Sequence, residues 1–355
     1  MMIIDELYYD AIDLLKKLIA VPSFSKEESA AADLLQSYIE QKGIPTFRSG
    51  NNVWCMSPEQ TPEKPTILLN SHIDTVKPVP GWTKNPFEAS ESDGILYGLG
   101  SNDAGASLVT LLHAFFALTE KSQPYNLIFL AACEEEISGK GGIESVLPQL
   151  PPVSFAVVGE PTQMNIAVAE KGLMVLDCSV SGIAGHAARD EGENAIYKAV
   201  KSIDWFRTYE FPKISETLGK VKMNVTQINA GTQHNVIPDS CSFVVDVRTT
   251  DCYTNREVFE MIDAAVDCEV KARSFRLNPS GISREHPFVQ RVIISGSRPF
   301  GSPTLSDQAL LSCPSVKIGP GDSARSHMGD EYIKTDEIRE ALELYVKLLD
   351  FIFVS

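Results

Sequence analysis

The stretch PTILLNSHID, at residues 65–74, is a short apolar run that ends in a histidine and an aspartate. Three further apolar runs are NLIFLAAC (126–133), SFAVVGE (154–160) and SVKIG (315–319). Strands that are apolar on both faces are typical of a parallel sheet covered by helices. The sequence therefore predicts an α/β fold with a mostly parallel sheet and helices on both faces.

The segments between these runs have helical patterns. Apolar residues recur at helical spacing over 5–19, and Ser25 followed by Glu28 is a capping-box signal that predicts a second helix. Further helices are expected over 106–119 and 334–353. This alternation of strands and helices supports the α/β prediction.

The pattern changes after residue 166. Strands that alternate between apolar and polar residues are expected there, and a helix is expected over 194–206. The alternating segments are MVLDCSVSG (174–182), KVKMNVTQINAG (220–231) and SCSFVVDVRTT (240–250). We therefore expect a smaller α+β domain at 166–280, inserted into a catalytic domain made of 1–165 and 281–355. A length of 355 residues also favours two domains over one.

Composition and charge exclude several classes of protein. The chain has 31 Lys and Arg against 47 Asp and Glu, a net charge of −16, which argues against a nucleic-acid or anionic-membrane partner. The apolar runs are far shorter than the roughly 20 residues that a membrane helix needs. We expect neither nucleic acid nor membrane as a partner.

The seven cysteines are scattered and never form a CxxC pair. This argues against a disulfide scaffold and against a thiolate zinc site. Asp5 and Glu6 stand where a secretory signal needs positive charge. Both observations favour the cytoplasm.

Acidic and imidazole side chains follow the predicted strands. In α/β sheets, ligand-binding residues gather beyond the carboxyl ends of strands. Each residue alone has an ordinary structural interpretation, such as a turn former or a solvated helix end, but their coincidence at one edge favours a functional site. The residues are His72 and Asp74, Asp103 at the end of the long loop 77–102, Glu134 to Glu136, Glu160 and His327.

Two imidazoles and several carboxylates without a thiolate suit zinc, with cobalt or manganese as alternatives. The charge favours two ions, because two divalent cations would offset most of the charge of five carboxylates. A carboxylate that bridges two ions about 3.5–4 Å apart lets both act on one water. A glutamate not bound to metal could then serve as general base. The five carboxylates belong to Asp74, Asp103, Glu135, Glu136 and Glu160.

Seven motifs together resemble the family of dinuclear zinc hydrolases that includes aminoacylase, acetylornithine deacetylase and succinyl-diaminopimelate desuccinylase. They occur in the family's order and cover nearly the whole chain. The motifs are SHIDTV (71–76), YGLGSNDAG (97–105), CEEEISGKGG (133–142), VGEPT (158–162), GHAARDEGENAI (185–196), GTQHNVIPDSCSFVVDVR (231–248) and ARSHMGDEYI (324–333).

The resemblance implies roles for the metal ligands. His72 and Glu160 would hold one metal ion, Glu136 and His327 would hold the other, and Asp103 would bridge the two. The chain departs from the family after the bridging aspartate, where Asp103-Ala104-Gly105-Ala106 replaces the common Asp-Met-Lys-Gly. The departure leaves the ligand intact and removes the family's lysine.

The resemblance also implies the catalytic residues. Asp74 would orient the imidazole of His72, and Glu135 would be the general base. A shift of the alignment by one residue would make Glu134 the base instead.

Three residues of the inserted domain complete the inferred site. His186 would stabilise the oxyanion of the reaction, and family dimers supply this histidine from the partner subunit, so a homodimer is expected. Asn235 and Arg248 would bind a substrate carboxylate. For Arg248, an ion pair within the sheet is the alternative.

The function implied by the resemblance is that of a zinc-dependent enzyme that hydrolyses linear amides. The expected substrate is a small N-acyl amino acid, N-acetylornithine or N-succinylornithine, which would place the protein in arginine biosynthesis. Succinyl-diaminopimelate desuccinylase and di- or tripeptidase activities use the same core and stay open. A metal-less scaffold would lack some ligands, whereas all five are present. A dinucleotide-binding site at Gly319–Ala324 fits the sequence poorly, because no helix is expected to begin there.

Overall fold

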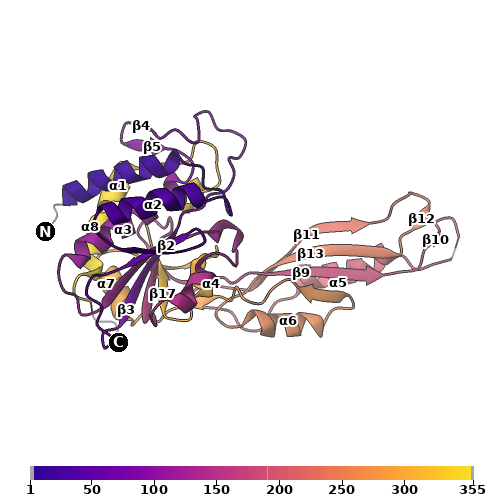
Figure 1. Ribbon diagram of the computed structural model, residues 1–355. Helices are drawn as coiled ribbons and strands as arrows, with labels where there is room; N and C mark the ends of the chain where they lie inside the picture. Colours follow the sequence, from indigo (N-terminus) through magenta and orange to yellow (C-terminus); the bar gives the residue numbers. More distant parts are fainter. Residues whose placement is uncertain (1–3, 190, 353–355) are drawn as a thin grey trace. The chain divides into compact units, whose positions relative to one another are not determined.

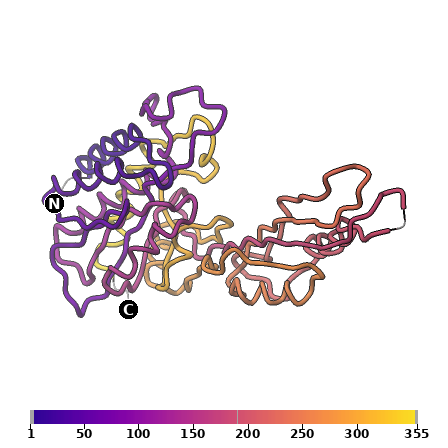
Figure 2. The backbone as a smooth tube through the Cα atoms, turned by 45° about the vertical axis from the view of Figure 1, so that its right-hand side comes forward, coloured from indigo at the N-terminus to yellow at the C-terminus, as the bar shows by residue number. Residues whose placement is uncertain are grey.

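The computed structural model describes residues 4–189 and 191–352. The chain divides into two compact units. Unit 1 comprises 1–168, 282–300 and 306–355, and unit 2 comprises 169–281 and 301–305. The colours of Figure 2 show that the chain begins in unit 1, passes through unit 2 and returns to unit 1 for its last helix.

A twisted sheet forms the centre of unit 1, in the order β1-β2-β6-β3-β7-β17-β8. β3 pairs in parallel with β6 and β7, and β7 pairs in parallel with β17, whereas the outer pairs are antiparallel. The strands are β1 (Thr46–Ser49), β2 (Asn52–Met56), β3 (Thr66–His72), β6 (Asn126–Ala132), β7 (Phe155–Val158), β8 (Ile166–Glu170) and β17 (Ser315–Lys317). The predicted mostly parallel α/β sheet is confirmed.

Helices cover both faces of this sheet because its central strands are apolar on both sides. Ile67 and Leu69 of β3 pack into the large core under α1, α2, α3, α7 and α8, whereas Leu68 packs on the opposite face with α4. Figure 1 shows α1, α2, α3 and α8 on one side of the sheet. The helices are α1 (Ile4–Ile19), α2 (Ser29–Gln41), α3 (Ala106–Thr119), α4 (Ile143–Val146), α7 (Pro287–Ile294) and α8 (Thr335–Leu349).

The long loop predicted at 77–102 contains two short strands. Together with β18 they form a small sheet in the order β18-β5-β4, and β18 lies in the segment after His327. The strands are β4 (Ser90–Ser92), β5 (Ile95–Tyr97) and β18 (Tyr332–Lys334). An irregular turn, Ser101–Gly105, whose backbone is not helical at Asp103 and Ala104, then leads into α3.

Unit 2 is built on an antiparallel sheet in the order β11-β13-β9-β14. Burial alternates along β9 and β13, as their alternating sequences predict, and the inward residues pack against α5 and α6. The elements are β9 (Met174–Ser181), β11 (Lys222–Ala230), β13 (Ser240–Arg248), β14 (Glu269–Ala272), α5 (Ala195–Thr208) and α6 (Asn255–Asp263). Two short strands of unit 2, β10 (Gly185–His186) and β12 (Val236–Ile237), pair with each other, whereas the short strands β15 (Ser280–Gly281) and β16 (Pro299–Ser302) pair with β8 of the large sheet.

Within the described residues, no helix is both long and apolar enough to cross a membrane.

Candidate functional site

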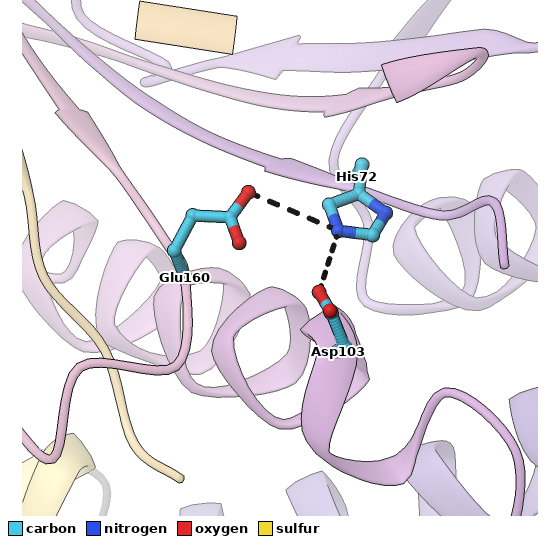
Figure 3. Close-up of side chains that lie close together, drawn as sticks. All are labelled: His72, Asp103 and Glu160. Carbon is cyan, nitrogen blue, oxygen red and sulfur yellow. Dashed lines mark hydrogen bonds and ion pairs between the residues drawn. The ribbon is translucent and has the colours of Figure 1, made fainter. Parts of the chain in front are cut away.

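Three potential metal ligands meet at the carboxyl edge of the unit 1 sheet. His72 is the last residue of β3, Glu160 follows β7, and Asp103 lies in the irregular turn before α3. The Nε2 atom of His72 lies 3.2 Å from Asp103 Oδ1 and 3.8 Å from Glu160 Oε1 (Figure 3). The three ligand atoms lie within 4.8 Å of one another, close enough to hold one metal ion.

A second group shares Asp103 with the first. The Nε2 atom of His327 lies 3.0 Å from Glu136 Oε2 and 3.7 Å from Asp103 Oδ2. The two oxygens of Asp103 therefore face different histidines, Oδ1 toward His72 and Oδ2 toward His327. A carboxylate in this position can join two metal ions.

Asp74 lies beside His72 but contacts it through its main chain. His72 Nδ1 donates a hydrogen bond to the backbone oxygen of Asp74 at 2.8 Å, whereas the carboxylate lies 3.6 Å away, beyond hydrogen-bond distance. The carboxylate of Asp74 accepts the backbone N–H groups of Glu135 and Glu136 at 3.0 and 3.1 Å. Asp74 thus fixes both the ring of His72 and the backbone of the acidic triplet.

Glu331 fixes the position of Asp103, a role that the sequence does not predict. Its buried carboxylate accepts the backbone N–H groups of Gly100, Asn102 and Asp103 at 3.0, 2.9 and 2.9 Å. Glu331 belongs to the quoted motif ARSHMGDEYI, four residues after His327. That motif was the only sequence signal pointing to it, because its partners are backbone groups far away in the chain.

Two acids of the site, Glu160 and Glu135, have raised pKa values, whereas the effect of burial on Asp103 is outweighed by the hydrogen bond to His72 and by other partners, which lower the pKa of this carboxyl. Burial, together with the charge of Asp103, raises the pKa of Glu160 to about 8. Burial and the charge of Glu160 hold the pKa of Glu135 well above its usual range. Both shifts have one cause, because several carboxylates are confined in a site shielded from water.

The histidines have raised pKa values because of the same carboxylates. Burial alone would lower the pKa of His72, but the carboxylates of Asp103 and Asp74 outweigh it and raise that pKa well above its usual value. The hydrogen bond to Glu136 raises the pKa of His327 to about 9. The carboxylates that crowd this site would be stabilised by positive charge, which divalent cations would supply. The donor set of two imidazoles and carboxylates therefore fits metal ions such as zinc.

Glu134 and Glu135 point in different directions. The carboxylate of Glu134 accepts the backbone N–H of Gly141 at 3.2 Å, and so turns toward the glycine-rich turn after the triplet. Glu135 lies close enough to Glu160 and His72 for its pKa to respond to their charges. Of the two candidates for the base, Glu135 is the one beside the potential metal ligands.

The other three predicted residues lie in unit 2. His186 is exposed at the end of β10, and its Nδ1 accepts the N–H of Ala188 at 3.1 Å. Asn235 precedes β12, which pairs with β10, and its backbone oxygen accepts the N–H of Ala187. His186 and Asn235 thus lie on paired segments of unit 2.

Arg248 stands apart from this pair within unit 2, as the last residue of β13. Its guanidinium binds both carboxylate oxygens of Asp246, at 2.8 and 3.0 Å. The ion pair considered from the sequence is therefore present in the structure.

The sequence is similar to a known protein family and to several of its members. The model of peptidase family M20/M25/M40 matches residues 68–350. The chain is 28% identical over 355 residues to a putative succinyl-diaminopimelate desuccinylase of Mycobacterium tuberculosis, covering 96% of this chain and 98% of the relative. It is 26% identical over 376 residues to an acetylornithine deacetylase of Proteus mirabilis, covering 96% of each.

Solved structures share the fold. The aminopeptidase PepT of Bacillus cereus superimposes with a TM-score of 0.78 at 19% identity, covering 96% of this chain and 98% of that one. The Bacillus subtilis YXEP protein, described as a dinuclear metal-binding peptidase, superimposes with a TM-score of 0.75 at 17% identity, covering 98% and 100%.

Proposed function

The chain belongs to peptidase family M20/M25/M40 and is a metal-dependent amidohydrolase, and from this premise we propose that it removes the acyl group from an N-acyl amino acid. The observation that carries the proposal is the placement of Asp103 between two groups of ligands, with one oxygen toward each histidine. This arrangement suits the activation of a water next to an amide carbonyl.

In the proposed site, His72 and Glu160 hold one divalent cation, Glu136 and His327 hold the other, and Asp103 is shared. Zinc is the first candidate, with cobalt or manganese as alternatives. When bound, the pair of cations supplies Lewis-acid activation of water and of the scissile carbonyl.

The chain's own groups move the protons and hold the charges. Glu135 takes a proton from the attacking water and delivers it to the leaving nitrogen as the C–N bond breaks. His186 donates a hydrogen bond to the oxyanion that develops on the carbonyl oxygen. Asn235 and Arg248 bind a substrate carboxylate, for which the planar guanidinium is well suited.

The proposed substrates are N-acetylornithine and N-succinylornithine, which would place the enzyme in arginine biosynthesis. The chain resembles a putative desuccinylase about as closely as it resembles an acetylornithine deacetylase, with 28% and 26% identity over 96% of its length. Succinyl-diaminopimelate is therefore the second candidate substrate. Di- and tripeptides are the third, since structural relatives include an aminopeptidase and a tripeptidase.

A panel of these compounds, assayed with the purified protein loaded with Zn²⁺ or Co²⁺, tests the proposal. We expect hydrolysis of one N-acyl amino acid to exceed that of the peptides in kcat/KM. Preference for di- or tripeptides would replace the deacylase proposal by a peptidase. No hydrolysis of any compound by the metal-loaded protein would contradict the proposed site.

A homodimer formed through unit 2 is proposed as the active species. Large apolar side chains are exposed on α5 (Ile196, Tyr197, Val200) and on the edge strand β11 (Ile228), and Tyr197 is 75% exposed. Such a surface beside an unpaired strand edge is typical of an interaction site. Light scattering should give twice the chain mass, and Tyr197→Glu should yield monomers. A wild-type monomer with full activity would overturn the proposed dimer.

The cytoplasmic location stays a prediction.

A further inference from the structure

The loop between α1 and α2 carries the predicted capping box, but the structure uses these residues differently. α2 begins at Ser29, and its N-terminus has no side-chain cap. The prediction that Ser25 and Glu28 form a capping box is therefore wrong. The side chain of Glu28 binds the backbone of Glu134 instead, 106 residues later in the chain, and that of Ser25 binds Asp74.

Glu28 is a fully buried carboxylate with partners on both oxygens. Its Oε1 accepts the backbone N–H groups of Lys26 at 2.7 Å and of Glu134 at 3.1 Å. Its Oε2 accepts a hydrogen bond from the side-chain amide of Asn51 at 2.8 Å. Burying a carboxylate is costly unless such bonds satisfy it, so the contact with Glu134 is part of a fixed arrangement.

Ser25 reaches the same triplet through Asp74. Its hydroxyl donates to Asp74 Oδ2 at 2.7 Å, and the carboxylate of Asp74 accepts the N–H groups of Glu135 and Glu136. Two carboxylates thus hold three successive backbone N–H groups, those of residues 134, 135 and 136.

The backbone of the triplet needs this support. Glu134 has a φ of 57°, in the left-handed region that is unfavourable for a residue with a side chain. Such a conformation persists where surrounding contacts determine it. Glu28 binds the N–H of this very residue, immediately before Glu135.

We propose that Glu28, assisted by Ser25, is a positioning residue that fixes the orientation of Glu135 toward the reacting water. The inference rests on the proposed function, in which Glu135 is the base. Neither Glu28 nor Ser25 contacts a potential metal ligand's side chain in the described contacts. Glu28 binds the backbone next to Glu135, so its effect is expected mainly on proton transfer, whereas Ser25 binds Asp74, which also holds His72 and the backbone of Glu136. They act through the backbone at 134 and through Asp74.

The test compares Glu28→Ala, Glu28→Gln and Ser25→Ala in the metal-loaded protein. We expect Glu28→Ala to lower kcat by about 10- to 100-fold with KM and metal content near wild type, the range usual for removing a supporting contact. Glu28→Gln should recover part of kcat, because its amide oxygen can still accept the N–H of Glu134. Ser25→Ala should lower kcat less than Glu28→Ala.

Glu27→Gln is the matched control, because Glu27 is an exposed carboxylate of the same loop; its kcat should equal that of wild type. Hydrogen exchange of the peptide covering 130–140 gives a readout independent of turnover, and the amides of the triplet should exchange faster in Glu28→Gln than in Glu27→Gln. Wild-type kcat together with wild-type exchange in Glu28→Gln and Ser25→Ala would overturn the positioning role. If the wild type hydrolyses no compound of the panel, the proposed function fails, while the exchange measurement still decides whether Glu28 holds the triplet.

Discussion

The candidate residues of unit 1 and those of unit 2 are held in contrasting ways. In unit 1, four of the five potential metal ligands are buried or half-buried and His327 is exposed; Asp103, for example, is fixed by Glu331 from a distant part of the chain. In unit 2, His186 is exposed and its ring bonds to a near neighbour, Ala188. We therefore expect the unit 1 residues to hold metal in a preformed arrangement and His186 to act on a substrate.

Replacing Asp103 is expected to have the largest effect. Asp103→Ala removes the one carboxylate common to both ligand groups, so the protein should lose both metal ions and all measurable turnover. Metal analysis after dialysis checks this, with Asp93→Ala, an exposed aspartate, as control. Two ions retained per chain would refute the shared role of Asp103.

Replacing the base should be the next most damaging change. We expect Glu135→Gln to lower kcat by about 10²- to 10⁴-fold while the metal content stays at the wild-type level, since proton transfer contributes that much. Glu134→Gln is the matched control and should keep most of the activity, because its carboxylate faces Gly141. Greater loss in Glu134→Gln than in Glu135→Gln would shift the base by one residue.

The exposed histidine of unit 2 should affect turnover without affecting metal. His186→Ala should lower kcat by about 10²- to 10³-fold, the usual cost of losing an oxyanion donor, with metal content and melting temperature unchanged. His234→Ala, a second exposed histidine of unit 2, provides the control. Equal activity of the two variants would remove His186 from the proposed mechanism and would leave unit 1 as the whole of the catalytic machinery.

The sequence predicts the elements that position the site better than it predicts the contacts that support them. His72 and Glu160 were found because an apolar run followed by a polar group marks a strand and its carboxyl end. α3 was predicted over its full range because its residues are almost all apolar. These features depend on residue type and on order along the chain, which a sequence displays directly.

The supporting contacts could not be predicted because their partners are backbone groups. Glu28 binds an N–H 106 residues away, and Glu331 binds one 228 residues away. No residue-type pattern records such a partner. In the case of Ser25 and Glu28 the local pattern favoured a helix cap, and tertiary contacts prevailed. Asp74 lies beside His72, as its position in the sequence predicts, but its carboxylate binds the backbone of the acidic triplet.

Arg248 could bind a substrate carboxylate or form a structural ion pair, and the two roles predict different effects of replacing it. These effects are expected to be the smallest. If its guanidinium binds a substrate carboxylate, Arg248→Ala should raise KM by about 10- to 100-fold, as expected for losing a charge-assisted hydrogen bond. Asp246→Asn weakens the same ion pair but leaves the guanidinium in place, so its KM should stay near wild type or fall.

If the ion pair is structural, the two variants should behave alike: each should lower the free energy of unfolding by up to about 1 kcal/mol, since the pair is partly exposed, and neither should change KM. Steady-state kinetics and denaturant unfolding of both variants therefore separate the two roles. A rise in KM confined to Arg248→Ala would bring this residue into the substrate-binding group with Asn235, whereas a shared loss of stability would leave substrate recognition in unit 2 to the segments around His186.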